Sequence, residues 1–521
     1  MDKINYMKKI ILFLLLFPGL VKSQPITSGA IDSLVEKVLI SFNVPGIAVG
    51  VVKDGKIIHA KGYGLRSLNT KQPTTPNTLF GIASNSKAFT CAALGILVEQ
   101  GKIKWEDHVR DYIPEFKLYD PYVTEHFTIK DLLTHRSGMG LGAGDLMFFP
   151  DSSDFTLKDI IYNLRFLPQS SEFRTKYDYD NNLYIIAGEV ISRVSGLSWD
   201  EFIEKNILRP LGMKTSAASY ERLPDYQDVI DGHAPINGIV RTIPRNTLRV
   251  GHAAGGIYAN INDLSQWLIC LMNKGISPAG KKILAESTIK ELWTPQTILP
   301  VYSPGIYNVH FSAYGLGFVL SDVKGKFQAT HTGGLEGMVT QITMLPEINL
   351  GIIVLTNQQE GSAFVTITNT IKDSYLGVKG IDWHERLKKA RIQELAEAKK
   401  IMDSVENEIN TATQKAETNW KPFLGIYRDP WMGEVTVHEK NGQPWLQMKR
   451  SPKLTGQLFP YKGTTMVVRW NDRSMDADAF VNFGLDEEGR GKTIRMRAIS
   501  PLTDFSFDFH DLRFERAEKT K

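Results

Sequence analysis

A serine and a lysine three residues apart, Ser84 and Lys87, could do chemistry together. They precede an apolar run, Ala88 to Gln100, whose spacing predicts a buried helix that ends at Gly101, with both residues in its first turn. Residues three apart are neighbours on a helix, so the lysine amine could take the hydroxyl proton and activate the serine as a nucleophile. Ser-x-x-Lys also occurs by chance at ordinary helix starts, so the pair alone does not identify an active site.

A phenol and a carboxamide, Tyr179 and Asn181, lie two residues apart just before a second predicted helix. From one loop both can point into the same cleft, where Tyr179, partly a phenolate beside Lys87, would pass a proton between Ser84 and a leaving group. Asn181 would hydrogen-bond Lys87 or a substrate carbonyl, and Asp180 would raise the pKa of Lys87. The alternative is an ordinary turn with an aromatic packing residue.

A histidine and two glycines occur together in His331-Thr332-Gly333-Gly334, at the end of a predicted strand. The glycines would let a substrate backbone approach and lie alongside as an added strand. We expect His331 to face the site with a pKa near 6.5, so that its binding of a substrate carboxylate weakens from about pH 6 to 8. The alternative is a structural or proton-transfer histidine.

Helices between an early hairpin and a late group of strands predict an α+β fold whose antiparallel sheet is closed by both ends of the domain. The early hairpin turns at Asp54-Gly55. Helices are predicted over 28–42, 128–133, 184–194, 199–208 and 264–272, and strands over 47–52, 57–61, 315–321, 327–331, 339–345 and 350–356.

A charged helical connector is predicted over residues 381–417, between a domain at 24–380 and a second one at 418–517. Short strands at regular spacing make the second domain a small antiparallel barrel or sandwich, with a hairpin at Asn441-Gly442. Its strands are expected over 422–427, 434–438, 443–449, 466–470, 479–483, 494–499 and 505–509.

The ends and the composition of the 521-residue chain limit its location and partners. Lysines followed by an apolar run, Ile10 to Leu20, predict a signal peptide over residues 1–23, hence export to the periplasm or medium, and no later stretch is long enough to span a membrane. The net charge of +4 is dispersed, so nucleic acid is not an expected partner. Neither metal nor cofactor is predicted, and Cys91 and Cys270 are expected to be buried free thiols instead of one disulfide bond.

Taken together and in this order, the three motifs resemble the serine β-lactamase and penicillin-binding protein superfamily. More narrowly, they are similar to its class C β-lactamase-related branch, which includes D-amino-acid peptidases, D,D-carboxypeptidases and carboxylesterases. The resemblance covers about residues 28 to 375 and includes Leu132–Gly138, Pro210–Thr215, Ala254–Tyr258, Tyr314–Phe318 and Gly351–Asn357. The C-terminal domain resembles the lipocalin-like appendage of some exported peptidases, which can shape the cleft or support oligomers.

The resemblance implies a β-lactamase/transpeptidase-like antiparallel sheet with a helical cluster, and a role for each motif. Ser84 would be the acylated nucleophile, with Lys87 and Tyr179 as the proton-transfer pair. Backbone N–H groups of Ser84 and Gly334 would form the oxyanion hole. Asn181 would position the substrate amide.

The third motif would bind substrate through His331, Thr332 and Gly333 as well as Gly334. Many relatives have lysine where this chain has His331, a pattern more similar to the peptidases and esterases than to efficient β-lactamases. The resemblance thus implies an exported serine hydrolase that acts through a Ser84 acyl-enzyme on small or D-amino-acid-containing peptides. The alternatives are a carboxylesterase or β-lactamase of the same fold, or a non-catalytic receptor for peptidoglycan fragments. Assembly as a homo-oligomer stays open.

Overall fold

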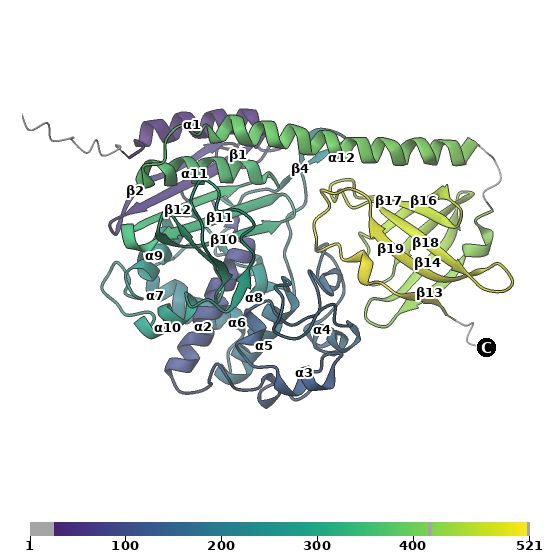
Figure 1. Cartoon of the computed structure of the whole chain (residues 1–521), viewed down its shortest axis with the longest axis horizontal. Coiled ribbons are helices and arrows are strands. Elements are labelled where there is room, and N and C mark those ends of the chain that lie inside the picture. Colours follow the sequence, from purple (N-terminus) through teal and green to yellow (C-terminus); the bar gives the residue numbers. More distant parts are fainter. Residues whose placement is uncertain (1–24, 415–418, 518–521) are drawn as a thin grey trace, which may run out of the picture.

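The computed structural model describes residues 25–414 and 419–517. The predicted signal peptide, residues 1–23, lies outside the described residues. An α+β region is followed by a closed β-barrel, and the long helix α12 (Trp383–Gln414) extends from the first to the second (Figure 1). None of the helices in the described part of the chain combines the length and the apolar character needed to cross a membrane.

The antiparallel sheet of the α+β region joins strands from both ends of that region. The first strand pairs with the last, with Val49 opposite Val354, so the predicted closure of the sheet is confirmed. In the described residues the strand order is β2 (Lys56–Gly64), β1 (Gly46–Lys53), β12 (Leu350–Thr356), β11 (Met338–Leu345), β10 (Lys326–Leu335), β9 (Val319–Val323), β8 (Ser312–Tyr314) and β7 (Thr297–Leu299).

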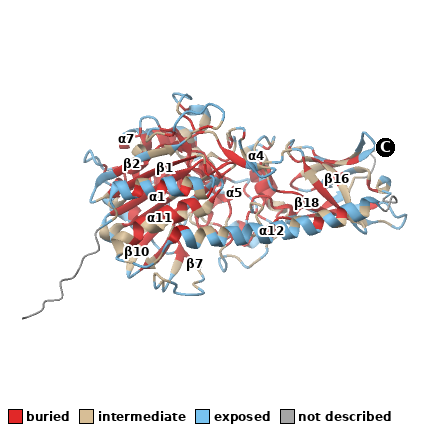
Figure 2. Ribbon diagram, turned by 90° about the horizontal axis from the view of Figure 1, so that it is seen from above, coloured by how far each residue is buried: buried red, intermediate tan, exposed pale blue. Residues whose placement is uncertain are grey.

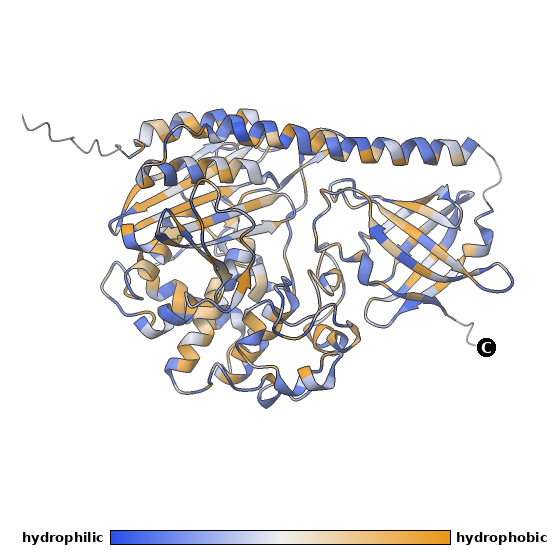
Figure 3. Ribbon diagram, viewed as in Figure 1, coloured by the Kyte–Doolittle hydropathy of each residue, from blue (hydrophilic) through white to orange (hydrophobic). Residues whose placement is uncertain are grey.

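Both faces of this sheet are covered, which explains why its central strands are apolar throughout. Ile47, Val49 and Val51 of β1 point to one face and pack with α1 (Ser28–Ser41) and α11 (Gly361–Leu376). Ala48 points to the other face and joins the core around the helix that begins at Lys87. The sheet strands are correspondingly buried in Figure 2 and apolar in Figure 3.

The second face is covered by the helices that surround α2 (Lys87–Glu99), the helix predicted behind Lys87. The helices of this part of the described chain are α3 (Pro121–His126), α4 (Leu157–Asn163), α5 (Asn182–Ser195), α6 (Trp199–Ile203), α7 (Arg209–Leu211), α8 (His252–Gly255), α9 (Ile261–Met272) and α10 (Glu286–Leu292). Short strand pairs are β3 (Phe80–Gly81) with β6 (Tyr258–Ala259), and β4 (His233–Ile236) with β5 (Ile239–Thr242). Cys91 in α2 and Cys270 in α9 are buried free thiols, as predicted.

The C-terminal barrel closes because its first and last strands pair, with Tyr427 opposite Arg516. Asn441 and Gly442 both have positive φ, at 54° and 72°, and form the predicted hairpin turn. Around the barrel, the strands described are β13 (Gly425–Asp429), β14 (Gly433–Lys440), β15 (Gln443–Met448), β16 (Thr455–Lys462), β17 (Thr465–Trp470), β18 (Ala479–Leu485), β19 (Gly491–Ala498) and β20 (Phe514–Arg516).

Helix α12 packs on both parts of the molecule. Near its start it lies along α11, where Arg391 pairs with Glu360 at 2.9 Å. Its second half lies on the barrel, where Val405 and Ile409 pack with Phe480 and other apolar barrel residues. The outer side of this helix is exposed (Figure 2).

Two sequence predictions near helix α2 were wrong. The helix expected over 128–133 is a single 3₁₀ turn, Asp131–Leu133, because His135 soon afterwards adopts a left-handed φ of 53° and ends any helix. The strand expected over 315–321 begins only at Val319, because Gly317 turns with a φ of 76°. A Cβ at Gly317 would lie 2.7 Å from Cα of Ala88, so only glycine allows this close approach to α2.

Three predictions in the barrel also need correction. Residues 505–509 form no strand. The alternating phenylalanines imitate one, but Phe507 is buried in a loop and Phe509 begins a 3₁₀ turn, Phe509–Asp511. The strand expected from Pro422 begins at Gly425, after a 3₁₀ turn. Strands β16 and β20 were missed, since β16 contains Gly456 and Pro460, which are rare in strands, and β20 is only three residues long.

Candidate active site

Ser84 lies in a 3₁₀ turn, Ala83–Ser86, between β3 and α2, and not in the first turn of the helix as predicted. Ala83 has a φ of 50°, a left-handed conformation that costs about 1–2 kcal/mol for a residue with a Cβ. The turn is held against β6 by hydrogen bonds from the Ile82 N–H to the Ile257 carbonyl, at 2.9 Å, and from the Ile257 N–H to Ser86 Oγ, at 3.1 Å. The surrounding structure thus fixes a strained turn that presents Ser84 to a pocket.

Lys87 is fully buried beneath Ser84. Its Nζ donates hydrogen bonds to Ser84 Oγ at 3.1 Å, to Asn181 Oδ1 at 2.7 Å and to the Ala254 carbonyl at 2.9 Å. Burial lowers the pKa of Lys87 to about 7, against the opposing effect of the Asp145 and Asp180 carboxylates. Asp180 acts in the predicted direction, but burial outweighs it, so the amine can lose its proton near neutral pH.

Tyr179 is a neutral phenol, which corrects the expectation of a partial phenolate. Its ring centroid lies 4.8 Å from Lys87 Nζ and 4.1 Å from that of His135. Burial raises the pKa of Tyr179 well above its ordinary value, although the nearby Ser84 hydroxyl acts to lower it. The phenol therefore faces the Ser84 side of the pocket as a proton donor and not as a resident anion.

The loop that carries Tyr179 is fixed by His135, which the sequence analysis did not single out. The His135 carbonyl accepts a hydrogen bond from the Asp178 N–H at 2.9 Å, and its Nδ1 accepts one from the Asp180 N–H at 3.1 Å. Burial holds the pKa of His135 well below its ordinary value, so the ring stays neutral and Nδ1 remains an acceptor. Both residues beside Tyr179 are thus held by one buried side chain and its backbone.

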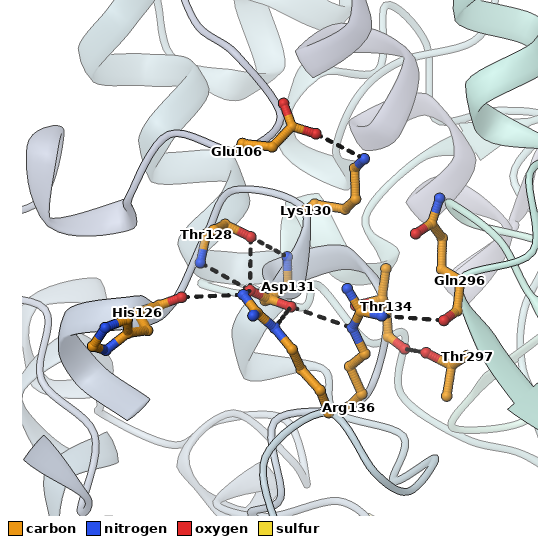
Figure 4. A network of polar contacts seen from close by, with 10 residues as sticks. Glu106, His126, Thr128, Lys130, Asp131, Thr134, Arg136, Gln296 and Thr297 are labelled. Carbon is orange, nitrogen blue, oxygen red and sulfur yellow. Dashed lines mark hydrogen bonds and ion pairs between the residues drawn. The ribbon is translucent and has the colours of Figure 1, made fainter. Parts of the chain in front are cut away.

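A polar network around Asp131 connects the loop of His135 with the segment that leads to Tyr179 (Figure 4). The fully buried Asp131 carboxylate accepts hydrogen bonds from Arg136 Nε at 3.2 Å, from Arg174 Nη2 at 2.5 Å and from Thr128 Oγ1 at 2.7 Å. Burial raises the pKa of Asp131, but the bonds from Arg174 and Thr128 outweigh burial and leave it below its ordinary value. The charged carboxylate therefore joins the His135 loop to the segment that leads to Tyr179.

Replacing Asp131 with asparagine is expected to lower the free energy of unfolding by about 3 kcal/mol, because two arginines lose a buried anionic partner. The measurement is chemical denaturation at pH 7. Glu106→Gln is the matched control: its carboxylate, 73% exposed, pairs with Lys130 in the same region, and its loss should cost less than about 1 kcal/mol. The Asp131 contribution is complete above about pH 4 and is lost as the pH falls through its lower folded-state pKa. Equal effects of the two substitutions would contradict this role.

Asn181 connects Lys87 to a buried carboxylate that the sequence analysis missed, Asp145. Asn181 Nδ2 donates a hydrogen bond to Asp145 Oδ2 at 2.8 Å, while its Oδ1 accepts one from Lys87. Burial raises the pKa of Asp145 well above its ordinary value, although the hydrogen bond from Asn181 acts to lower it. When both groups are charged, the ammonium can only donate and the carboxylate can only accept, and these contacts then fix the orientation of the amide. Asp145 lies in the 3₁₀ turn Asp145–Met147, 36 residues before Asn181, and no local motif marks it.

His331 lies in the pocket wall but is uncharged, so the expected titration near pH 6.5 was wrong. Burial and the nearby Lys87 lower the pKa of His331 to about 3. Its Nδ1 lies 2.5 Å from the Thr332 carbonyl, which can only accept, so Nδ1 carries the proton. Nε2, 3.0 Å from the Tyr314 hydroxyl, is then the acceptor. His331 offers substrate a neutral ring instead of a cation.

The glycines after His331 continue strand β10 to Leu335 instead of following its end. Gly333 does not line the pocket: a Cβ there would lie 2.3 Å from the Ile82 carbonyl oxygen, so this glycine lets the nucleophile turn approach the sheet. Thr332 and Gly334 do line it. Strand β9 pairs with β10 only as far as Thr330, which leaves the edge of β10 beside these residues open.

A pocket of about 300 Å³ brings together most of the predicted site residues. Ser84, Tyr179, Asn181, His331, Thr332 and Gly334 line it, and Lys87 lies beneath it in contact with Ser84. Its wall also includes Asp504, Phe505 and Ser506 of the barrel, which the sequence analysis missed because it placed this segment partly in a strand. The barrel therefore forms part of the candidate active site.

Residues 31–375 match the protein family described as Beta-lactamase. The chain belongs to the beta-lactamase family. Residues 410–516 of this family member match a domain of unknown function, DUF3471, which covers the barrel.

Curated relatives of this beta-lactamase family member include a named hydrolase. The unguisins hydrolase ungD' of Aspergillus campestris is 29% identical over 376 residues, which is 68% of this chain and 66% of that protein. Protein flp of Staphylococcus aureus is 27% identical over 329 residues, which is 63% of this chain and 62% of that protein. The chain thus spans less than two thirds of these relatives' length.

Solved structures share the fold of this beta-lactamase family member. The octameric penicillin-binding protein homologue from Pyrococcus abyssi has a TM-score of 0.60 at 23% identity and covers 93% of this chain and 99% of its own. A class C beta-lactamase has a TM-score of 0.54 at 22% identity and covers 67% of this chain and 96% of its own. The first likeness extends over the barrel as well as the α+β region.

Proposed function

We propose that this protein is a serine hydrolase that transfers an acyl group from a small peptide or an ester to Ser84 and then to water. The observation that carries the proposal is the contact of Ser84 Oγ with Lys87 Nζ, at 3.1 Å, in a pocket that also holds Tyr179. A lysine whose pKa is lowered to about 7 can act as a base at neutral pH, which a lysine of ordinary pKa cannot.

In the proposed acylation step, Lys87 accepts the Ser84 proton, directly or through the Tyr179 phenol, while Ser84 Oγ attacks the substrate carbonyl. The carbonyl oxygen becomes an oxyanion, stabilised by the backbone N–H groups of Ser84 and Gly334. Collapse of this intermediate breaks the bond to the leaving amine or alkoxide, which takes up the proton. Water then attacks the acyl-enzyme by the same route, and the acid and free Ser84 are released.

The charges around the pocket favour substrates that need no carboxylate for recognition. Neither lysine nor arginine is found among the described residues that line the pocket, and His331 is neutral. The open edge of β10 can take an extended peptide as an added strand, as predicted for the glycine motif. We therefore favour neutral peptides and esters over β-lactams and carboxylate-ended peptides. The relative named for hydrolysing unguisins supports a hydrolase over a receptor.

Recognition of a substrate carboxylate is expected to be independent of pH between 6 and 8. Because His331 titrates near 3, the ratio of KM for a carboxylate-ended peptide to KM for its C-terminal amide should change less than about twofold across this range. The titration of Lys87 affects the peptide and its amide equally, so its effect cancels in the ratio of the two KM values. A ratio that rises fivefold or more from pH 6 to 8 would show that His331 is charged at the lower pH.

Covalent labelling tests the proposed function directly. The full chain is treated with a fluorophosphonate and with a fluorescent penicillin, and the labelled peptide is identified by mass spectrometry. Fluorophosphonate labelling at Ser84, together with turnover of D- or L-configured dipeptides or of short-chain nitrophenyl esters, is the expected result. Turnover of a chromogenic cephalosporin should be slow or absent. No labelling at Ser84 would favour a non-catalytic receptor.

Two further proposals concern location and assembly. We propose export, because the lysines and the apolar run of residues 1–23 have the pattern of a signal peptide. A periplasmic or secreted product that begins at Gln24 would support it, and a cytoplasmic product with an intact N-terminus would contradict it. The Pyrococcus abyssi homologue is octameric, and we propose that this protein also forms a homo-oligomer. Light scattering of the purified protein would test this proposal.

A further inference from the structure

The long connection between β19 and β20 extends from the barrel into the wall of the active-site pocket. Asp504, Phe505 and Ser506 of this connection line the same pocket as Ser84. The ring of Phe505 lies edge-on to that of Tyr179, with centroids 5.7 Å apart. The barrel thus meets the candidate catalytic residues at their side chains.

A chain of hydrogen bonds leads from this connection to the catalytic lysine. Ser506 Oγ donates to Asp145 Oδ2 at 2.8 Å, and Asn181 Nδ2 donates to the same oxygen at 2.8 Å. Asn181 Oδ1 then accepts from Lys87 Nζ at 2.7 Å. All four residues are at most 7% exposed, so water has little access to replace any of these contacts.

The backbone that carries Asp145 is fixed by the same connection. The carboxylate of Asp508, which is fully buried, accepts hydrogen bonds from the Gly144 N–H at 2.7 Å and from the Leu146 N–H at 3.2 Å. These are the residues on either side of Asp145. The barrel therefore holds Asp145 twice, at its backbone through Asp508 and at its carboxylate through Ser506.

We propose that the C-terminal barrel completes the catalytic centre, with Ser506 as a positioning residue that acts on Lys87 through Asp145 and Asn181. This inference rests on the proposed function of Lys87 as the base. Without the Ser506 hydroxyl, Asp145 Oδ2 keeps only the bond from Asn181, and the carboxylate loses one of the groups that hold it facing the amide. Asn181 is then free to turn away from Lys87.

The charges near Lys87 give the inference a pH signature. Burial raises the pKa of Asp145 well above its ordinary value, and the hydrogen bonds from Asn181 and Ser506 act to lower it. The charged form of Asp145 in turn raises the pKa of Lys87 against the effect of burial. Loss of the hydroxyl should thus make the Lys87 pKa lower than in the wild-type protein. The other titratable groups that interact with Lys87 or Asp145 are Cys91, His135, Tyr179, Asp180, Tyr184, His331 and Asp508, and Asp504 acts on Tyr179.

The test compares Ser506→Ala and Ser506→Thr with the wild type, each in the full chain. For Ser506→Ala we expect kcat/KM for a nitrophenyl ester to fall tenfold or more, as for other buried charged groups that lose a hydrogen bond, and the acidic limb of its pH profile to move to lower pH. Ser506→Thr keeps the hydroxyl and should restore both. Thr465→Ala, which removes a hydroxyl bonded to Asn482 elsewhere on the barrel, should change neither.

The rate of fluorophosphonate labelling as a function of pH is the second readout, because it reports Lys87 without substrate turnover. A wild-type rate and pH profile in Ser506→Ala would overturn the inference. So would a loss of activity that Ser506→Thr does not restore and that leaves the acidic limb in place, since that pattern indicates a purely steric role. If the wild type itself is not labelled at Ser84, the proposed function fails, and this failure is distinct from the first two.

Discussion

Replacing Ser84 with alanine is expected to remove every hydrolytic activity of this protein while leaving its fold intact. A covalent nucleophile has no substitute in the pocket, so kcat/KM for peptides and esters should fall by more than about a thousandfold. The hydroxyl is not part of the hydrophobic core, and the turn that carries it is held by hydrogen bonds of Ile82 and Ser86 with the backbone of Ile257. The melting temperature should therefore change little. Initial rates and a thermal melt of the two proteins give both quantities.

Ser170→Ala is the matched control for this experiment. Ser170 is an exposed serine that does not line the pocket, and its substitution should leave both activity and labelling unchanged. Residual activity of Ser84→Ala above a thousandth of wild type would rule out Ser84 as the nucleophile. Labelling that persists in Ser84→Ala and maps to another serine would place the reaction elsewhere.

Local sequence signals were sufficient for most of the fold and for the residues that surround Ser84. The turn at Asp54-Gly55 and the apolar run of β12 are each signals within a short stretch of sequence. The hairpin and the central strand could therefore be predicted from the sequence. The same holds for Ser84 and Lys87, which are three residues apart and therefore in contact whether the turn is 3₁₀ or α. The contact between Ser84 and Lys87 can thus be predicted from a single sequence.

Contacts between distant segments could not be predicted in this way. Asp145 and Ser506 are 361 residues apart, and nothing in the spacing of either residue indicates the other. The segment around Ser506 also alternates polar and aromatic residues as a strand does, although burial of Phe507 and Phe509 against neighbouring segments produces that pattern in a loop. The part that the barrel plays in the pocket therefore became visible only in three dimensions.

The protonation states of the titratable side chains in the pocket depend on how deeply each side chain is buried. The sequence motifs do not predict the burial of a single side chain. Tyr179 was expected to be partly a phenolate because of the nearby Lys87 ammonium, and His331 to be partly charged because an imidazole titrates near pH 6.5 in water. Both lie fully inside the pocket wall beside the cationic Lys87, and burial keeps both neutral. Burial brings the pKa of Lys87 and that of Asp180 to about 7, and of these two groups Lys87 is the one in contact with Ser84 Oγ, which supports the lysine as the proposed base.

Lys87→Met and Tyr179→Phe are each expected to lower kcat/KM by about 10²–10⁴-fold, because each removes one member of a proton-transfer pair. The double variant should be little worse than the more damaged single variant, since residues that act as one unit are not additive. Steady-state kinetics with a nitrophenyl ester at pH 8 provides the comparison. Multiplication of the two single effects would show that Lys87 and Tyr179 act independently.

The pH profile separates the loss of a base from the loss of packing. Lys87 is charged below its pKa of about 7 and cannot then accept a proton, so wild-type kcat/KM should rise about tenfold per pH unit below 7 and level off above it. Lys87→Met should lose this limb.

Lys372→Met is the control, because Lys372 is also buried, with a pKa lowered to about 8, but donates a hydrogen bond to Gln328 outside the pocket. It should keep both the rate and the limb. A limb near pH 7 that survives in Lys87→Met would assign the titration to another group, and Asp180, whose pKa burial raises to about 7, would be the first candidate.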